Sequence, residues 1–316
     1  MKNVNNVELS IVSTIYNDAD IVPILVKEII LNCELLNVNF EIILINDFSS
    51  DNSEEEIKKV CRLFKNVKGI SLARNFGQQI AMSAGMRYAS GRYIIVMDGD
   101  LQNPTSEIPN LYNEIKKGYD VVYTVSKIRN NFLDKFTSLF FWMILTKIFG
   151  VRIVQNQLMM KIMNHDFVKR FNQYNEIHRT VAGIVRDISS HYKVLEVKNL
   201  PRKIGKSHYS FIKRFNLLID ILISLSNSPL NMMIYLGWFI FLMTILTSIY
   251  YLTQFIFFNV PSGFTSIILS IFFFGSLIVL LLGFIGRYLS NIYNEVRRRP
   301  LFHVKETFNI KSENPK

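Results

Sequence analysis

Residues 93–100 read Tyr-Ile-Ile-Val-Met-Asp-Gly-Asp. The apolar run Tyr93–Met97 suits a buried parallel strand, and it ends in two carboxylates, Asp98 and Asp100, with one glycine between them. Ligands of open α/β sheets bind at the carboxyl ends of the strands. Two carboxylates on a tight turn can hold a hard divalent cation that bridges a diphosphate, and Gln102 offers a third oxygen. The alternative, for these residues by themselves, is a solvated Asp-Gly turn without function.

Strand and helix patterns alternate along the N-terminal region. Strands are expected at Glu8–Ile15, Phe40–Ile45, Val67–Leu72 and Tyr93–Met97, and helices at Ile21–Leu36, Ser53–Phe64 (with Ser53 as cap) and Gln78–Ala89. This alternation is typical of an α/β fold with a mostly parallel sheet. Neither G-x-G-x-x-G nor G-x-x-x-x-G-K-[ST] occurs, so neither a dinucleotide-binding fold nor a P-loop is supported.

Polar clusters follow each of these strands. They are Tyr16-Asn17-Asp18, the segment Asn46–Asp51, the segment Ala73–Gly77, and the pair Asp98 and Asp100. Asn, Asp, Ser and Gly are common in turns, so any one cluster could be ordinary turn chemistry. Because the carboxyl ends of parallel strands share one edge of a sheet, all four clusters are expected to meet there. Their coincidence favours a binding site.

The C-terminal region lacks Asp, Glu, Lys and Arg from Ile221 to Gly286. A turn-forming cluster at Asn259–Gly263 divides this run into halves at about 231–258 and 264–285, and a membrane span needs about 20 residues. The halves therefore predict a two-helix transmembrane hairpin, with buried helices of a soluble domain as the alternative. The flanking basic residues place the N-terminal region and both termini in the cytoplasm by the positive-inside rule. They are Lys203, Lys206, Lys213 and Arg214 before the spans, and Arg287, Arg297, Arg298 and Arg299 after them.

The net charge of +11 lies largely beside the predicted spans, where anionic lipid headgroups account for it. No aromatic or zinc pattern points to nucleic acid, which we exclude as a partner. Four regions are expected: a catalytic domain over residues 1–208, a juxtamembrane amphipathic helix over 209–230, the spans within 231–286, and a basic tail over 287–316 whose part from Phe302 onward is loosely ordered. Cys33 and Cys61 are expected to form neither a disulfide nor a metal site.

Together these motifs resemble those of family 2 glycosyltransferases with the GT-A fold. They are most similar to the membrane-bound subgroup of dolichol-phosphate mannose synthase and bacterial polyprenyl-phosphate glycosyltransferases. The resemblance covers nearly the whole chain and keeps one order of motifs. The matching segments are Ser13–Asp18, Asn46–Asp51, Ala73–Gly77, Asp98–Pro104, Arg202–Tyr209, Ser228–Leu230, Gly286–Leu289 and Arg299–Leu301.

The resemblance implies a role for each motif residue. Asp98 lies near the sugar and ribose of a nucleotide-sugar donor, and Asp100 and Gln102 hold Mg²⁺ or Mn²⁺ against its diphosphate. Arg202 and Lys206 bind the donor diphosphate or the phosphate of a lipid acceptor, with ordinary positive charge beside the membrane as the alternative. The residues implied to contact the base and ribose are Tyr16, Asn17, Asp18 and Asp47.

The function implied is that of a metal-dependent inverting hexosyl- or N-acetylhexosaminyltransferase. It acts from the cytoplasmic face of the membrane, in contact with membrane lipids, on a polyprenyl (undecaprenyl) phosphate acceptor. Two alternatives stay open, a hydroxyl acceptor on a lipid-linked glycan of a surface polysaccharide and a non-catalytic subunit of the same fold. The hairpin could also pair with copies of itself, so a homo-oligomer is left open.

Two departures from the subgroup bear on the acceptor. Met159 stands where the subgroup usually has an Asp, and no carboxylate occurs between Asp134 and Asp166. A lipid phosphate is already anionic at neutral pH and needs no general base, whereas a sugar hydroxyl normally does. The subgroup also has an arginine in the segment that aligns with Thr124-Val125-Ser126, and this chain lacks it. Lys127 and Arg129 are candidate substitutes. Lys161 aligns with the arginine of the motif in which Met159 replaces the usual Asp. The apolar segment 131–149 is expected to be an interfacial helix, with a buried core helix as the alternative.

Overall fold

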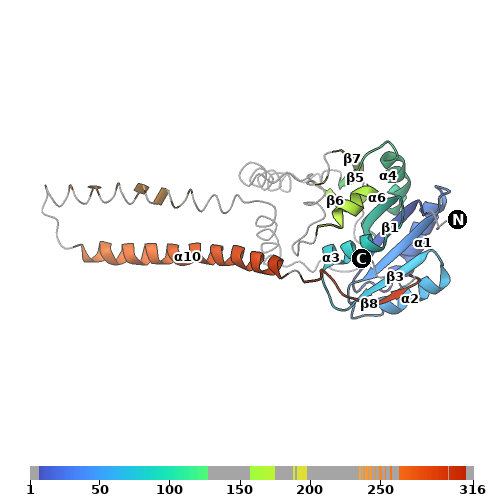
Figure 1. Ribbon diagram of the computed structural model, residues 1–316, viewed down its shortest axis with the longest axis horizontal. Coiled ribbons are helices and arrows are strands. Elements are labelled where there is room, and N and C mark those ends of the chain that lie inside the picture. Colours follow the sequence, from blue (N-terminus) through green and yellow to red (C-terminus); the bar gives the residue numbers. More distant parts are fainter. Residues whose placement is uncertain are drawn as a thin grey trace. The chain divides into compact units, whose positions relative to one another are not determined.

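The computed structural model describes residues 7–126, 157–174, 188, 191–197, 263–297 and 299–310, with single helical positions between 235 and 257. Two compact units make up the chain. The first contains Met1–Thr137, Ile153–Tyr209 and Pro300–Lys316, and the second contains Ser138–Arg152 and Ser210–Arg299. Figure 1 shows the strands of the first unit and the long C-terminal helix of the second.

The first unit is built on a mixed sheet with strand order β7-β5-β6-β4-β1-β2-β3-β8. Parallel pairing joins β1 to β2 and β4, β2 to β3, and β5 to β7. Strand β6 runs antiparallel to both β4 and β5, and β8 runs antiparallel to β3. The strands are β1 Leu9–Ile15, β2 Phe40–Asn46, β3 Val67–Leu72, β4 Tyr93–Asp98, β5 Val121–Ser126, β6 Gln157–Asn164, β7 Tyr192–Val197 and β8 Val304–Phe308.

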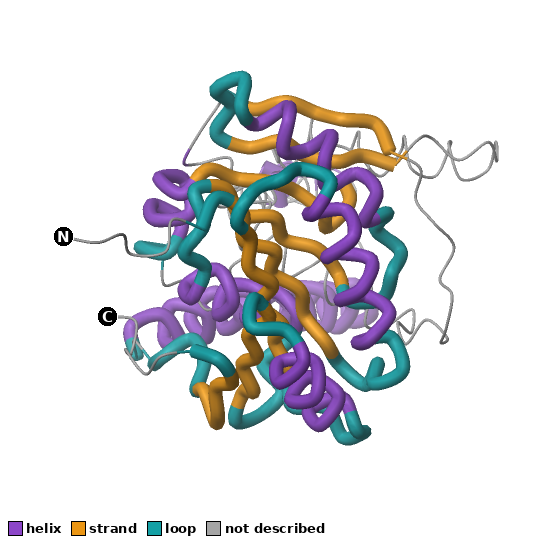
Figure 2. Tube along the Cα trace, turned by 90° about the vertical axis from the view of Figure 1, so that its right-hand side faces the viewer, coloured by secondary structure: helices purple, strands orange, loops and turns teal. Residues whose placement is uncertain are grey.

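Helices cover both faces of this sheet (Figure 2). On one face, α1 (Val22–Glu34), α2 (Ser53–Leu63) and α4 (Ile108–Ile115) pack against the sheet through one apolar cluster. On the other face, α3 (Gln78–Tyr88) and α6 (His165–Phe171) pack through a second cluster. The near-continuous apolar runs of β1, β2 and β4 follow from this burial on two sides. The α/β architecture expected from the sequence is thus confirmed as a mixed sheet with flanking helices.

The predicted bounds of the first four strands agree with the observed ones to within one residue, and those of β3 are the same. The prediction that Ser53 caps helix α2 is wrong. Ser53 is the first residue of this helix, and the side chain of Asn52, which precedes it, makes no capping hydrogen bond. The buried Ser53 hydroxyl instead accepts a hydrogen bond from the Asp18 N–H at 3.1 Å. Ser53 therefore joins the start of α2 to the loop after β1. Cys33 and Cys61 are buried free thiols, and burial raises the pKa of each to about 12.

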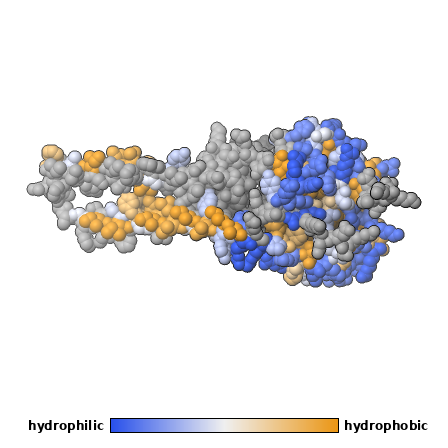
Figure 3. All heavy atoms as spheres, viewed as in Figure 1, coloured by the Kyte–Doolittle hydropathy of each residue, from blue (hydrophilic) through white to orange (hydrophobic). Residues whose placement is uncertain are grey.

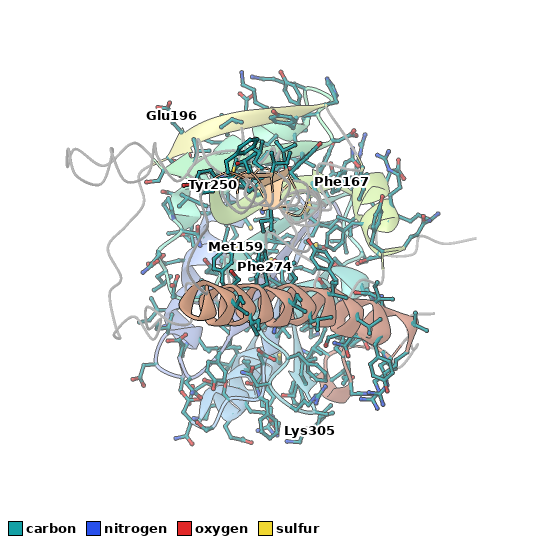
Figure 4. All side chains as sticks on the ribbon, turned by 90° about the vertical axis from the view of Figure 1, so that its left-hand side faces the viewer. Met159, Phe167, Glu196, Tyr250, Phe274 and Lys305 are labelled. Carbon is teal, nitrogen blue, oxygen red and sulfur yellow. The ribbon has the colours of Figure 1, made fainter. Side chains whose placement is uncertain are left out.

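The C-terminal segment is not loosely ordered throughout, as the sequence had suggested, because Val304–Phe308 forms β8. This strand pairs with β3, and Lys305 (Figure 4) forms an ion pair with Glu54 of α2 at 3.2 Å. The Asn309 amide donates to the backbone carbonyl of Val67 at 2.8 Å. Because charged side chains are usual on an exposed edge strand, the composition of 304–308 gave no strand signal.

The second unit contains α10 (Phe264–Val296), which includes the predicted second span 264–285. Hydrophobic side chains are exposed along it (Figure 3). Within the part of the chain that is described, no helix combines the length and the apolar character needed to cross a membrane. Most of the predicted first span, 231–258, lies outside the described residues, as do the whole of the segments 131–149 and 209–230. The transmembrane hairpin stays a prediction.

Candidate functional site

Asp98 ends β4 and is held from two sides. Its Oδ1 accepts a hydrogen bond from the Gln78 side chain, at the start of α3, and its Oδ2 accepts one from the Asn103 side chain at 3.2 Å. Gly99 follows, and a Cβ at this position would lie 2.5 Å from the carbonyl oxygen of Thr14. Only glycine therefore lets the turn pass this close to β1. This close approach fixes the backbone position of Asp100, the next carboxylate in the chain.

The turn after Gly99 brings Asp100 and Gln102 together. Asp100 Oδ1 accepts a hydrogen bond from the backbone N–H of Gln102 at 3.0 Å. Leu101 between them has a positive φ of 59° and a buried side chain, which anchors the turn to the core. Carboxylate and amide oxygens suit Mg²⁺ or Mn²⁺, but no group of three His, Cys, Asp or Glu side chains gathers in the described residues. A cation here would need further oxygens from a diphosphate or from water.

Asp47 follows β2 and is only 3% exposed. Its Oδ1 accepts from the Phe76 N–H at 2.8 Å, and its Oδ2 accepts from the Gly77 N–H at 2.9 Å. Burial raises the pKa of Asp47 above its usual value, against the lowering effect of these two hydrogen bonds. The carboxylate thus fixes the loop between β3 and α3. A direct contact with the donor base and ribose stays a prediction.

The loop after β1 is tied to the loop after β2. The backbone N–H of Asn17 donates to Ser49 Oγ at 3.1 Å, and Asn17 Oδ1 accepts from the Ser50 N–H at 2.8 Å. Ala19 N–H donates to Asp51 at 3.1 Å. Burial raises the pKa of Asp51, but hydrogen bonds from Ser53 and Ala19 outweigh it and hold the pKa below its usual value. Tyr16, Asn17, Asp18 and Asp47 therefore lie in one hydrogen-bonded pair of loops.

Lys161 lies within the sheet, on β6, opposite Val96 of β4 and Tyr123 of β5. Its side chain is 1% exposed, and its ammonium lies 5.7 Å from the centre of the Tyr123 ring. Burial lowers the pKa of Lys161 to about 8, while the negative charge of Asp98 acts in the opposite direction. The positive charge that the resemblance implied at this position is thus buried, and it interacts electrostatically with the Asp98 carboxylate.

Met159 (Figure 4) lies two residues before Lys161 on the same strand. Its sulfur is 3.7 Å from the side-chain nitrogen of Gln79 on α3. A thioether cannot take up a proton at neutral pH, so Met159 supplies no general base. The departure at Thr124-Val125-Ser126 lies at the end of β5. Its substitutes Lys127 and Arg129, and the basic-loop residues Arg202 and Lys206, lie outside the described residues.

Two residues that hold Asp98 were not among those singled out in the sequence. Gln78 follows the Ala73–Gly77 cluster directly, and Asn103 lies inside the matching segment Asp98–Pro104. Both are amide side chains that are common near turns, so only their position beside the polar clusters could have indicated them. The structure gathers Asp98, Asp100 and Gln102 at one turn and Tyr16, Asn17, Asp18 and Asp47 at the adjoining strand ends.

Comparison with known proteins gives matches along nearly the whole chain. The model of the family "Glycosyl transferase family 2" matches residues 10–171. An uncharacterized glycosyltransferase of Synechocystis is 30% identical over 307 residues, which cover 96% of each chain. An undecaprenyl-phosphate 4-deoxy-4-formamido-L-arabinose transferase of Proteus mirabilis is 31% identical over 313 residues, which cover 97% of this chain and 96% of that protein.

Similarity to solved structures is weaker. A crystal structure of residues 1–349 of S. aureus TarS with UDP-GlcNAc superposes with a TM-score of 0.46 at 15% identity, over 69% of this chain and 66% of that one. A mannosyltransferase of Pyrobaculum calidifontis with GDP-Man and Mn²⁺ gives 0.43 at 13% identity, over 70% and 64%. Superpositions this loose transfer no residue role to the present chain.

Proposed function

Because the chain belongs to glycosyl transferase family 2, and so is a sugar-transferring enzyme, we propose that it is a metal-dependent, inverting glycosyltransferase acting on polyprenyl phosphate. The donor is a nucleotide-diphosphate sugar, and the acceptor is undecaprenyl phosphate at the cytoplasmic face of the membrane. The observation that carries the proposal is the likeness to a protein named as an undecaprenyl-phosphate sugar transferase, which spans 97% of this chain.

The turn after β4 suits a divalent cation and a diphosphate. Asp100 and Gln102 would hold Mg²⁺ or Mn²⁺, because their oxygens are hard ligands and the Gln102 N–H already orients the Asp100 carboxylate. When bound, the cation stabilises the negative charge that grows on the departing diphosphate. Asp98 is oriented by Gln78 and Asn103, so it can accept hydrogen bonds from the hydroxyl groups of the donor sugar or ribose.

The acceptor needs no base from the protein. A phosphate oxygen of undecaprenyl phosphate attacks the anomeric carbon, a new C–O bond forms with inversion, and the nucleoside diphosphate leaves with the electrons of the old bond. Since the attacking oxygen is already anionic, a methionine at position 159 is compatible with this step. Arg202 and Lys206 are proposed to neutralise the phosphates during the reaction.

A membrane location is part of the proposal. The uncharged run Ile221–Gly286, with basic residues on both sides, supports a hairpin that keeps the catalytic unit and both termini in the cytoplasm. The exposed apolar side chains of α10 support it too, because such a surface is costly in water. They include Ile267, Ile271, Phe273, Ile278, Leu282 and Ile285.

The test is sugar transfer by the full chain purified in detergent. Undecaprenyl phosphate, Mn²⁺ or Mg²⁺ and a panel of radiolabelled UDP-, GDP- and dTDP-sugars are supplied, and label entering the organic phase is measured. Metal-dependent transfer from one donor supports the proposal and identifies the sugar. The variant Asp100→Ala is the matched control, because it removes the proposed ligand while leaving the lipid and the donor in place.

The same assay distinguishes the proposed function from the alternative acceptor, from a non-catalytic role and from metal-independent transfer. Label that enters only a lipid-linked sugar, and not undecaprenyl phosphate, would replace the phosphate acceptor with a glycan hydroxyl. Nucleotide binding with no transfer to either acceptor would favour a non-catalytic subunit. Transfer that persists in excess EDTA would overturn the metal dependence.

A further inference from the structure

Phe48 has a backbone conformation that an aromatic residue rarely adopts. It follows Asp47 at the end of β2, its φ is 60°, and its side chain is 51% exposed. Among the described non-glycine residues with positive φ, three are asparagines, and Leu101 is explained by its buried side chain. Phe48 is the apolar member of this set whose side chain faces solvent, so core packing does not account for it.

The surrounding hydrogen bonds hold Phe48 in this conformation. Before it, the Asp47 N–H donates to the Ile15 carbonyl at 3.0 Å, and the Asp47 carbonyl accepts from the Asn75 side chain at 3.1 Å. After it, the Ser49 N–H donates to Asn46 Oδ1 at 3.0 Å. The backbone on both sides is therefore fixed, and the ring is displayed from a rigid turn. Strain that the surroundings over-determine is characteristic of functional sites.

A second exposed aromatic residue occupies the matching place on the neighbouring strand. Tyr16 follows β1 and is 52% exposed. Strands β1 and β2 are parallel neighbours with Ile15 opposite Asn46, so both aromatic residues follow their strands at the same edge of the sheet. The hydrogen bonds of Asn17 to Ser49 and Ser50 join the two turns. Two aromatic side chains thus extend from one cross-linked pair of loops.

The phosphate end of the candidate site is at a suitable separation. β4 with the Asp98–Asp100 turn lies on the other side of β1 from β2. Neighbouring strands are about 4.8 Å apart, so Phe48 lies roughly 10 Å along the edge from that turn. A nucleoside diphosphate spans such a distance through its ribose and phosphates. Asn17 and Ser49 follow Tyr16 and Phe48 in the chain, and polar side chains at these places suit a flat ligand with a hydrogen-bonding rim.

We infer that Phe48 forms a stacking surface for the nucleobase of the donor, beside Tyr16, whose contact with the base the resemblance already implies. The inference rests on the proposed function, because it concerns the same nucleotide-sugar site. Every base has a π face, so stacking on Phe48 contributes affinity without choosing the base. The hydrogen-bonding groups of the two loops are then left to discriminate among the bases.

The test compares Phe48→Gly with the unchanged full chain in detergent. Glycine accepts a positive φ without strain, so this variant is expected to keep or raise the melting temperature while removing the ring. Calorimetric titration uses UDP, GDP, dTDP and CDP as probes, and inorganic pyrophosphate as a probe without a base. The best-bound nucleoside diphosphate is expected to lose about 5- to 150-fold in affinity, while pyrophosphate binding is unchanged.

Further variants exclude indirect effects. Phe48→Tyr restores an aromatic ring and is expected to recover the affinity that Phe48→Gly loses. Leu63→Ala removes another exposed apolar side chain, 74% exposed at the end of α2, and is expected to leave nucleotide affinity unchanged.

Three outcomes would overturn the inference. In the first, Phe48→Gly binds the nucleoside diphosphate as well as the unchanged chain does. In the second, it loses pyrophosphate and nucleotide equally, so that the loss does not pass through the base. In the third, it loses undecaprenyl phosphate instead of nucleotide, which would make the ring a lipid contact. An unchanged chain that binds no nucleoside diphosphate would instead overturn the proposed function itself.

Discussion

The Asp47 carboxylate at the end of β2 accepts a hydrogen bond at 2.9 Å from the backbone N–H of Gly77, the residue that precedes helix α3. The neighbouring Phe76 N–H occupies the other carboxylate oxygen. Because Gln78 comes next and donates to Asp98, Asp47 sets the position of a residue that orients the end of β4. The buried side chain of Asp47, after β2, thus helps to orient the Asp98 carboxylate at the end of β4.

Asp47→Ala is therefore expected to weaken donor binding more than it slows the chemical step. The substitution also leaves the Phe76 and Gly77 N–H groups without their acceptor, which costs about 1–3 kcal/mol for each group that stays buried. Donor KM and kcat, with a thermal melt of the same preparation, measure these effects. A large fall in kcat at unchanged donor affinity would contradict the expectation.

Asp100→Ala is expected to abolish turnover. A bound cation contributes several kcal/mol to the stabilisation of developing charge, so the loss corresponds to about a thousandfold or more in rate. The fold should persist, because the hydrogen bond from the Gln102 N–H to Asp100 lies within one turn at the edge of the sheet. Radiolabel transfer at saturating Mn²⁺, together with the melting temperature, provides the measurement. Full activity would remove Asp100 from the mechanism.

Glu41→Gln is expected to lower stability in a pH-dependent way. Glu41 is buried on β2, bonds to the Ser10 and Ser90 hydroxyls, and forms an ion pair with Lys68. Burial raises the pKa of Glu41, but the hydrogen bonds and the charge of Lys68 outweigh it, and the net shift is downward. A lowered folded-state pKa gives stability that is present above the unfolded pKa, about 4.3, and is lost as pH falls through the folded value.

At pH 7 the expected loss of stability for Glu41→Gln is about 2–4 kcal/mol, because one partner of a buried pair is removed. Melting temperatures of the two proteins should converge as pH falls below about 4. Lys68→Met is the companion variant, since it removes the other partner from a more exposed position. A difference between Glu41→Gln and the unchanged chain that is constant from pH 7 to pH 3 would exclude ionisation as the cause.

Long apolar runs explain how much of the fold could be predicted. β3 has the predicted bounds Val67–Leu72, and the carboxylates Asp98 and Asp100 at the end of β4 predicted the edge of the sheet at which the candidate site is placed. β6 lies between β4 and β5, and β8 lies beside β3, through pairings between segments distant in the chain. Local patterns carry no information about such pairings. The burial of Lys161 was missed for a similar reason, because a lysine between apolar residues usually marks a solvent-facing position.

Lys161→Met tests whether this buried charge serves the site or only costs stability. The pKa of Lys161 is lowered to about 8, so the charged side chain opposes folding at neutral pH. Stability of the unchanged chain should therefore rise between about pH 8 and 10.5, where the unfolded chain binds more protons. A shift of this size corresponds to about 3 kcal/mol.

Methionine has a similar length and no charge, so Lys161→Met is expected to raise the melting temperature at pH 7 and to lack the rise above pH 8. If the charge attracts and orients the Asp98 carboxylate, the same variant should lose about tenfold or more in kcat/KM. Transfer assays and melts from pH 7 to pH 10 measure both quantities. A variant that is more stable and fully active would show that the ammonium contributes nothing to the site, and one that is less stable would show that its surroundings compensate the charge.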